Sequence, residues 1–233
     1  MWTCVTAPNS LLAMVLKGAD KPWPPQRQVL RLLPISGGSF AGSFKNNIST
    51  MTAKALKKGY MQLTHEQKEK LTQIEVDMCI FEKSEFELFE TAFAHVEEIK
   101  VHVKPYSVLG TQRGSKAAGI HKPDPRYDTI VDPAGLPYIN GSGPRGAGYA
   151  SKSIYEHIHI DKDASFPKGV QGKITADTQA VAHAYPMPGA VEQRVVHVVG
   201  PDFRENPCQS EDAIQQLAKA YRNVFTAYVD SYK

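Results

Sequence analysis

The chain has 233 residues, of which 42% are hydrophobic, and a formal net charge of +3 at pH 7 with a pI near 8.6. Its length is enough for one large domain or two small ones with an ordinary core. The charge is too small to indicate a nucleic-acid surface, although it suits an anionic ligand. The sequence has no run of about 18 apolar residues and therefore predicts no membrane span. The residues before its first apolar stretch lack the positive charge of a signal peptide.

Cysteine and histidine spacing gives no sign of a metal site. Cys4, Cys79 and Cys208 stand alone, without the CxxC spacing of a zinc site. Four histidines in the second half of the chain lack ligand spacing with any cysteine or acid. We therefore expect free thiols, a reducing cytoplasmic location, no metal and no cofactor.

Residues 1–28 are expected to form an N-terminal extension. A strand at Trp2–Val5 and a helix at Asn9–Lys17 fit the spacing of the apolar residues there. The proline-rich connector Lys21–Gln26 then leads into a single compact domain, residues 29–233.

The first strand of that domain, Val29–Leu33, runs directly into a glycine-rich loop, Pro34–Gly42. Helices and strands then alternate, and two capping boxes mark helix starts. The expected elements are a helix at Thr52–Lys58, a helix from the capping box at Thr64 to about Leu71, a strand at Ile74–Phe81, a helix from the capping box at Ser84 with an apolar stripe of Phe86, Phe89, Phe93 and Val96, and a strand at Ile99–Val103.

A second strand followed by a glycine-rich loop begins at Asp128. The β-branched run Asp128–Asp132 predicts a strand that ends at Pro133, because proline cannot donate a ladder hydrogen bond. Four glycines from position 141 to 148 let the backbone approach a ligand, and apolar residues then recur at helical spacing from Ala147 to Ile158. The remaining expected elements are a basic loop at Gly110–Arg126, a polar loop at Asp161–Lys173, a weak strand at Ala180–Ala184, a buried strand at Arg194–Pro201, and a helix that Ser210 caps and whose apolar face runs to Tyr228.

Strands that alternate with helices predict parallel pairing and an α/β three-layer sandwich. In open sheets of this kind, ligands bind outside the carboxyl ends of the strands, where both glycine-rich loops fall. A glycine-rich loop followed by a helix N-terminus favours an anion, because unpaired N–H groups and the helix dipole face the charge.

Two other interpretations of the second loop stay open. The pattern Gly141-x-Gly143-x-x-Gly146 fits the dinucleotide fingerprint of NAD(P)-dependent enzymes, but eight residues with two prolines separate it from the preceding strand. The other interpretation is a surface connection that binds no ligand.

Three segments resemble the motifs of the macrodomain family of ADP-ribose-binding modules. Ile130–Gly135 and the following loop Gly141–Gly148 are similar to the family's strand and first glycine loop. Val196–Pro201 (VHVVGP) is similar to its strand of the form I-H-x-V-G-P, and Leu33–Gly42 (LPISGGSFAG) to its strand and second phosphate loop. In the family the last of these segments follows the other two, whereas here it precedes them. The resemblance, which covers about residues 29–230, therefore implies a circularly permuted macrodomain with a permuted strand order.

The resemblance implies that the diphosphate of the ligand lies between the two loops, held by backbone N–H groups, and that Phe40 covers the distal ribose. Residues Val199–Phe203 would bound the adenosine end, with Phe203 as a stacking ring. The residues expected to bind the ligand are Ser36, Gly37, Gly38, Ser39, Phe40, Ala41, Gly42, Gly135, Gly141, Ser142, Gly143, Pro144, Arg145, Gly146, Ala147, Gly200 and Pro201.

The chain departs from the family at positions that matter for hydrolysis. Gly135 stands where the best-known macrodomain hydrolases have an asparagine, and Arg145 stands where they have an acid. Arg145 is either a phosphate partner or a solvated loop charge. Asp132 is the one acid within the motif. It is either a functional residue, as a catalytic base or a ribose contact, or a structural residue at the strand end. Asn9, whose segment resembles the family's asparagine-bearing strand, is an alternative ribose contact.

We therefore expect the chain to bind ADP-ribose or an ADP-ribosylated partner, with hydrolysis of an ADP-ribose linkage left open. No residue after Val103 matches the family's adenine-contacting aspartate, so base specificity also stays open. The alternatives are an NAD(P)-type dinucleotide-dependent enzyme and a non-catalytic interaction domain. Neither a membrane nor a nucleic-acid partner is expected.

Overall fold

The computed structural model describes residues 28–113 and 121–233. The expected strand Trp2–Val5, the expected helix Asn9–Lys17 and the alternative ribose contact Asn9 lie outside the described residues. Six strands form one sheet. They are β1 (Val29–Leu32), β2 (Glu75–Cys79), β3 (Val101–Lys104), β4 (Asp128–Ala134), β5 (Ala180–Met187) and β6 (Val191–Val199).

The sheet has the spatial order β3-β2-β1-β4-β6-β5, and all neighbouring strands run parallel except β5 and β6. Helices alternate with the strands along the chain, which confirms the expected α/β fold with a mostly parallel sheet. They are α1 (Ile48–Met61), α2 (His65–Thr72), α3 (Lys83–Phe93), α4 (Tyr149–His157), α5 (Lys168–Gln171) and α6 (Ser210–Asp230).

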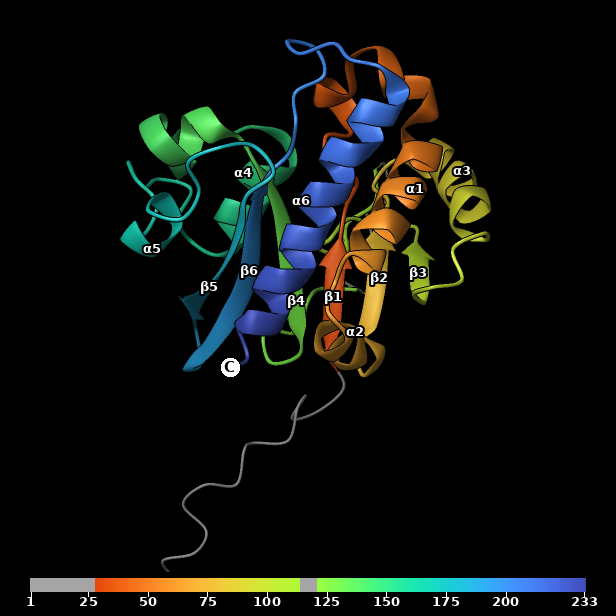
Figure 1. Cartoon of the computed structure of the whole chain (residues 1–233). Coiled ribbons are helices and arrows are strands. Elements are labelled where there is room, and N and C mark those ends of the chain that lie inside the picture. Colours follow the sequence, from red (N-terminus) through yellow and green to blue (C-terminus); the bar gives the residue numbers. More distant parts are fainter. Residues whose placement is uncertain (1–27, 114–120) are drawn as a thin grey trace, which may run out of the picture.

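Hydrophobic side chains pack on both faces of the sheet. Successive residues of a strand point to opposite faces, and Ile130 and Val131 of β4 accordingly belong to two different clusters of buried residues. One cluster joins the sheet to α1 and α6, which cover one face in Figure 1. The other joins the sheet to α4 and α5. This arrangement is compatible with a three-layer sandwich.

Local signals predicted several elements correctly. At the start of α2, the Thr64 hydroxyl accepts a hydrogen bond from the Gln67 N–H group, and the Gln67 side chain accepts one from the Thr64 N–H group. Phe89 and Phe93 of α3 are buried, as their stripe predicts. The apolar face of α6 is buried up to Tyr228.

The capping box expected at Ser84 is wrong. Helix α3 already begins at Lys83, so Ser84 lies inside the first turn rather than at the cap. The cap expected at Ser210 is wrong as well, because α6 begins at Ser210 itself and Gln209 is its N-cap. Other boundaries also moved. Helix α1 begins at Ile48, before the expected Thr52, because a 3₁₀ segment leads straight into it. The expected loop Asp161–Lys173 contains the short helix α5.

Pro133 does not end its strand, because β4 continues through Ala134. β1 pairs with β4 only as far as Ile130, whereas β6 pairs with β4 to its end. Beyond Ile130, the side of β4 that faces β1 is therefore unpaired. A proline on that side, which has no N–H group, removes no ladder hydrogen bond.

The two ends of the described domain lie side by side. Gln28 immediately precedes β1, and its Oε1 accepts a hydrogen bond of 2.8 Å from the hydroxyl of Tyr232, which follows α6. The guanidinium of Arg194 also lies 3.9 Å from the centre of the Tyr232 ring. A short connection would therefore be enough to join these ends.

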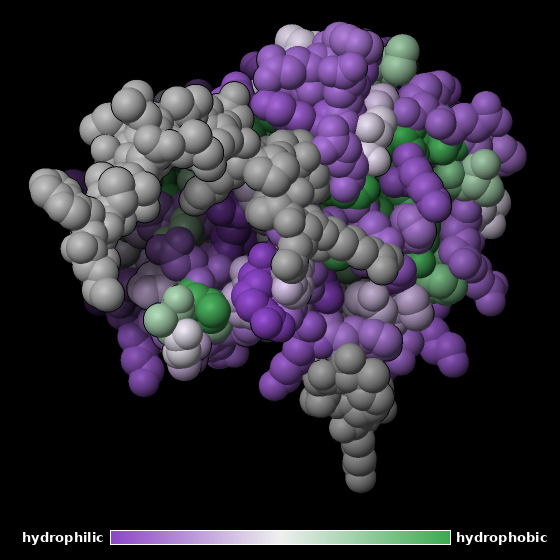
Figure 2. All heavy atoms as spheres, turned by 90° about the horizontal axis from the view of Figure 1, so that it is seen from below, coloured by the Kyte–Doolittle hydropathy of each residue, from purple (hydrophilic) through white to green (hydrophobic). Residues whose placement is uncertain are grey.

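Figure 2 shows the face at the amino ends of the parallel strands, where hydrophilic side chains cover most of the described surface. In the part of the chain that the structure describes, no helix combines the length and the apolar character of a membrane span.

Candidate functional site

The three segments with family-like motifs leave the sheet at one end. β1, β4 and β6 are consecutive and parallel, so their carboxyl ends lie together. β1 leads into η1 (Gly38–Asn47), β4 into η2 (Tyr138–Ser142) and η3 (Pro144–Gly146), and β6 into residues 200–209. Figure 1 shows all of these connections at the upper end of the sheet. The two glycine-rich loops therefore lie at the same end of the molecule.

Ser36, in the first loop, is buried and has an unusual backbone conformation. Its φ is 59°, which is uncommon for a residue other than glycine. The residue is 4% exposed, and its Oγ has no hydrogen-bond partner within residues 28–113 and 121–233. A Cβ at Gly200 would come within 2.5 Å of this oxygen, so glycine lets the end of β6 approach it. An unpartnered buried hydroxyl at a strand end is a candidate ligand contact.

The N–H groups of the first loop divide into two sets. Those of Gly37 and Phe40 donate to backbone carbonyls at 3.1 and 3.3 Å, so these two are not ligand donors in this conformation. Gly38 is the first residue of η1, and the described chain supplies no side-chain cap for that helix. Because the first N–H groups of a helix have no intrahelical partner, the start of η1 can donate to an anion.

Residues 200–203 run beside the first loop. The Phe203 N–H group donates to the Phe40 carbonyl at 3.1 Å, and a Cβ at Gly42 (φ 55°) would lie 2.6 Å from the Phe203 carbonyl oxygen. Phe203 itself is 2% exposed, and its ring packs edge-on against Phe44 at 5.2 Å. Its ring therefore serves the core and is not open to stack on an adenine.

The second loop uses most of its N–H groups internally. Those of Gly143, Arg145, Gly146 and Ala147 donate to backbone carbonyls, so they do not point at a ligand as expected. One of the acceptors is the carbonyl of Asp163. A Cβ at Gly143 (φ 70°) would collide with the backbone of Ala164, so glycine is required there for packing between loops.

The strongest donor position lies just after the second loop, at the start of α4. Gly148 precedes the helix, and no side chain of the described residues caps it. The N–H groups of the first turn, from Tyr149 to Ser151, therefore lack intrahelical partners. Together with the helix dipole they favour a negative charge. A Cβ at Gly148 would meet nothing within 4 Å, so this end of the helix is open.

Arg204 packs on the first loop, and Tyr149 opens α4. Tyr149 is 84% exposed and has a φ of 52°. Asp202 fixes Arg204 by accepting hydrogen bonds from its Nε at 3.0 Å and from its Nη2. The guanidinium lies 4.6 Å from the centre of the Phe40 ring. The hydrogen bonds to Asp202 raise the pKa of Arg204.

Asp132 is 0% exposed and belongs to a buried polar network. Its Oδ2 accepts hydrogen bonds from the Tyr155 hydroxyl at 2.6 Å and from His197 Nδ1 at 2.7 Å. On the other side of the imidazole, His197 Nε2 lies 2.8 Å from the Tyr185 hydroxyl. Burial and the nearby Asp132 raise the pKa of Tyr155 well above its usual range. This geometry favours the structural interpretation of Asp132, because its carboxylate faces the interior.

The other expected contacts differ in what surrounds them. Gly135 lies against the Tyr138 ring, where a Cβ would come within 2.8 Å, and a Cβ at Gly146 would come within 2.9 Å of the Ser142 side chain. Both glycines therefore allow the loop to pack on itself. Arg145 is exposed. Among the remaining expected contacts, Gly141 and Ser142 are exposed, Ala147 is half-buried, and Ala41, Pro144 and Pro201 are buried.

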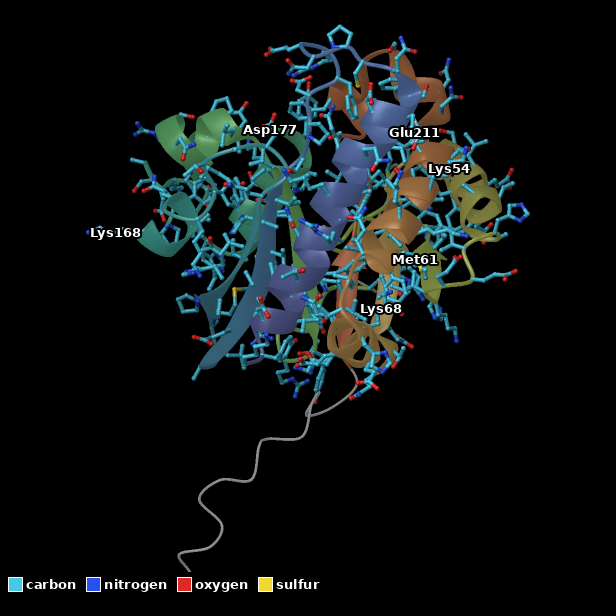
Figure 3. All side chains as sticks on the ribbon, in the orientation of Figure 1. Lys54, Met61, Lys68, Lys168, Asp177 and Glu211 are labelled. Carbon is cyan, nitrogen blue, oxygen red and sulfur yellow. The ribbon has the colours of Figure 1, made fainter. Side chains whose placement is uncertain are left out.

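Sequence analysis missed Asp177, which Figure 3 labels at the upper end of the molecule. The residue after it, Thr178, donates its N–H group to the Val199 carbonyl at 2.7 Å, which holds this turn at the end of β6. Burial and the charge of Asp202 raise the pKa of Asp177. Arg204 was missed as well, because its packing on Phe40 joins two segments that are distant in the sequence.

A second charged cluster lies nearer the amino ends of the strands, on the sheet face opposite α1 and α6. Arg31 forms an ion pair of 2.7 Å with Asp128 and donates to two backbone carbonyls. Asp77, on the neighbouring strand, lies 3.7 Å from Lys104 Nζ. Burial raises the pKa of Asp77 and of Asp128. These four residues help to line a cavity of about 580 Å³.

No protein-family model, curated protein or solved structure matches the chain. Among the described residues, no group of three or more His, Cys, Asp or Glu side chains could hold a metal ion. Cys79 and Cys208 are free thiols. Function is therefore inferred from the sequence motifs and from the arrangement of the residues that carry them.

Proposed function

We propose that the chain binds ADP-ribose, or a partner that carries it, at the carboxyl ends of β1, β4 and β6. The observation that carries this proposal is that the three segments with macrodomain-like motifs leave three consecutive parallel strands at one end of the sheet, where two of them come into contact. Gly200 packs on Ser36, and Phe203 is hydrogen-bonded to Phe40. Motifs that are far apart in the sequence thus lie at the same end of the sheet.

The diphosphate is the part of the ligand for which the donors are best defined. The starts of η1 and α4 both lack a side-chain cap in the described chain, and both lie at this end of the sheet. An anion between them would receive backbone N–H groups from each helix, and the dipole of α4 would add to the attraction. The unpartnered Ser36 hydroxyl supplies a further hydrogen-bonding group beside Gly200.

A circularly permuted macrodomain is the fold that we propose for this site. The contact between Gln28 and Tyr232 supports it, because the end of α6 lies where a loop to β1 would begin in an unpermuted chain. Moving the termini to such a position changes few contacts, which is why domains tolerate it.

Binding is favoured over hydrolysis. Asp132, the one acid within the motif, is fully buried and hydrogen-bonded to Tyr155 and His197. Gly135 and Arg145 replace the asparagine and the acid of the best-known hydrolases. With these changes, water near the anomeric carbon lacks its usual general base.

The dinucleotide-enzyme alternative receives less support from the geometry. Its fingerprint requires a strand, a tight glycine turn and a helix in direct succession. Here Gly141 lies in η2 and Gly146 in η3, and α4 begins only at Tyr149. The glycines therefore shape short helical turns instead of opening a helix.

Isothermal titration calorimetry of the full chain with ADP-ribose, NAD and AMP tests the proposal. Selective binding of ADP-ribose is the expected result. A preference for NAD would instead favour the dinucleotide-dependent enzyme, and no binding of any of the three would leave a non-catalytic interaction domain.

A further inference from the structure

We infer that the cavity that Arg31, Asp77 and Lys104 help to line binds a small zwitterion, namely a free amino acid with an apolar side chain. The cavity has a volume of about 580 Å³, which is within the usual range of small-molecule sites. It lies nearer the amino ends of the strands, away from the glycine-rich loops, so this inference does not depend on the proposed function.

The register of the sheet brings the charged side chains of this cavity onto one face. Arg31 of β1 is paired with Asp77 of β2, and Lys104 of β3 is paired with Cys79, two residues after Asp77. Alternate residues of a strand share a face of the sheet. Cys79 belongs to the apolar cluster on that face, so the charged side chains lie beside the end of this cluster.

Two polar atoms of the cavity wall are buried without a hydrogen-bond partner in residues 28–113 and 121–233. They are Asp77 Oδ1 and Arg31 Nε, whose residues are 5% and 8% exposed. Lys104 Nζ lies 3.7 Å from Asp77 Oδ1, which is too far for a hydrogen bond. Because buried polar groups are nearly always hydrogen-bonded, these atoms indicate a ligand that completes their bonding.

The distribution of charge selects the class of ligand. Asp128 already neutralises Arg31 through their ion pair of 2.7 Å. Asp77 and Lys104 remain as opposite charges that are not hydrogen-bonded to each other. A purely cationic ligand would meet the charge of Lys104, and a purely anionic ligand would meet the charge of Asp77. A ligand with both charges avoids either repulsion.

An amino acid satisfies all three unsatisfied groups at once. Its ammonium would donate to Asp77 Oδ1, and its carboxylate would accept from Arg31 Nε and from Lys104 Nζ, so each contact is a charge-assisted hydrogen bond. The Lys104 side chain is 29% exposed, and its flexible stem lets the ammonium follow the ligand carboxylate.

The rest of the lining favours an apolar side chain on the ligand. Val29, Tyr106 and Tyr127 also line the cavity. His121 stacks on the Tyr106 ring at 4.4 Å, and the Arg126 guanidinium lies 5.1 Å from the centre of the Tyr127 ring, so both rings are held in place. A branched aliphatic side chain against these residues would remove apolar surface from water.

Isothermal titration calorimetry of the full chain with L-leucine and two analogues tests the inference without any substitution. L-leucinamide lacks the carboxylate, and isocaproate lacks the ammonium. Each loses one set of charge-assisted hydrogen bonds, so each is expected to bind roughly tenfold or more weakly than L-leucine.

Two variants assign each charge of the ligand to its partner. Asp77→Asn should weaken L-leucine and L-leucinamide but not isocaproate, because isocaproate has no ammonium to lose. Lys104→Met should weaken L-leucine and isocaproate but not L-leucinamide. Lys57→Met is the matched control, because Lys57 of α1 pairs with Glu98 outside the cavity, and it should leave all three affinities unchanged.

The parent protein alone can overturn the inference. It fails if L-leucine does not bind, or if either analogue binds as tightly as L-leucine. It also fails if L-leucine binds but keeps its full affinity in both Asp77→Asn and Lys104→Met, because the amino acid would then occupy another site.

Discussion

Two turns of the chain, Asp124–Arg126 and Asp202–Arg204, have the same pattern but lie at opposite ends of the parallel strands. In each, the arginine N–H group and Nε both donate to the aspartate Oδ1 at 3.0 Å. Each guanidinium also lies over an aromatic ring, at 5.1 Å from the centre of Tyr127 and at 4.6 Å from that of Phe40. The local structures are therefore nearly the same.

Their surroundings differ in a way that decides what each end of the sheet can do. The first turn leads into β4, where Asp128 is already paired with Arg31. The second turn packs on Phe40 of η1, a segment distant in the sequence, at the end of the sheet where α4 also begins. The difference teaches that the Asp-x-Arg pattern specifies a turn, whereas the site that we propose depends on the uncapped helix starts at the carboxyl ends of the strands.

The largest effect on stability is expected at the amino ends. Arg31→Met would leave the buried Asp128 carboxylate without its partner, and removing one member of a buried pair costs about 3–5 kcal/mol. Urea denaturation should show that loss in the free energy of unfolding, while the folded variant keeps its affinity for ADP-ribose. A loss below about 1 kcal/mol, the range of exposed pairs, would show that the two ends of the sheet do not differ as described.

The largest effect on binding is expected at the carboxyl ends. Gly148→Asp places a carboxylate at the cap of α4, in open space and in an extended conformation that aspartate accepts (φ −122°). Aspartate is a favourable N-cap, so the fold should be retained. Like charges about 4 Å apart repel by about 4 kcal/mol at an effective dielectric constant of 20, so ADP-ribose should bind ~100-fold or more weakly in calorimetry.

Gly169→Asp is the matched control for that experiment. It makes the same change in open space on α5, and it should leave the affinity unchanged. Equal affinity of Gly148→Asp and the parent protein would remove the start of α4 from the site.

Sequence alone predicted the features that depend on neighbouring residues. The valine-rich run that became β6, the capping box at Thr64 and the apolar stripe of α3 follow from local spacing, and all are present. The positions of the two loops followed from the rule that glycine loops at strand ends meet where parallel strands end.

The details that sequence missed are long-range. In the second loop, the Arg145 N–H group donates to the Asp163 carbonyl. The Phe203 ring is buried against Phe44. The pairing of Arg31 with Asp128 joins two strands that are far apart in the chain. The hydrophobic periodicity of a segment predicts which face of its helix or strand a residue occupies. It does not predict which residue from a distant segment packs against that face.

A smaller effect is expected when the two matched arginines are compared for stability. Arg126→Gln and Arg204→Gln should unfold at nearly the same urea concentration as the parent protein, because exposed ion pairs contribute little. A marked destabilisation of Arg204→Gln alone would show that the two turns differ in what they contribute to stability.

The smallest effect concerns the pH dependence of the amino-end cluster. Burial raises the pKa of Asp77 above its ordinary value of 3.8, so the folded state holds this proton more tightly than the unfolded state. The contribution of Asp77 to stability therefore falls as pH rises from about 3.8 through the raised pKa. Asp77→Asn should remove that dependence. Thermal melts from about pH 4 to pH 7 should show the variant gaining stability relative to the parent protein as pH rises, and a relative loss would contradict the sign.

The most direct measurement is an NMR titration of the backbone amides with ADP-ribose. If the uncapped helix starts hold the diphosphate, the largest shifts will occur at Gly38 and from Tyr149 to Ser151, and the amides of Arg31 and Asp77 will stay in place. Largest shifts in β2 and β3, or no shifts at the start of α4 under saturating ligand, would contradict the account.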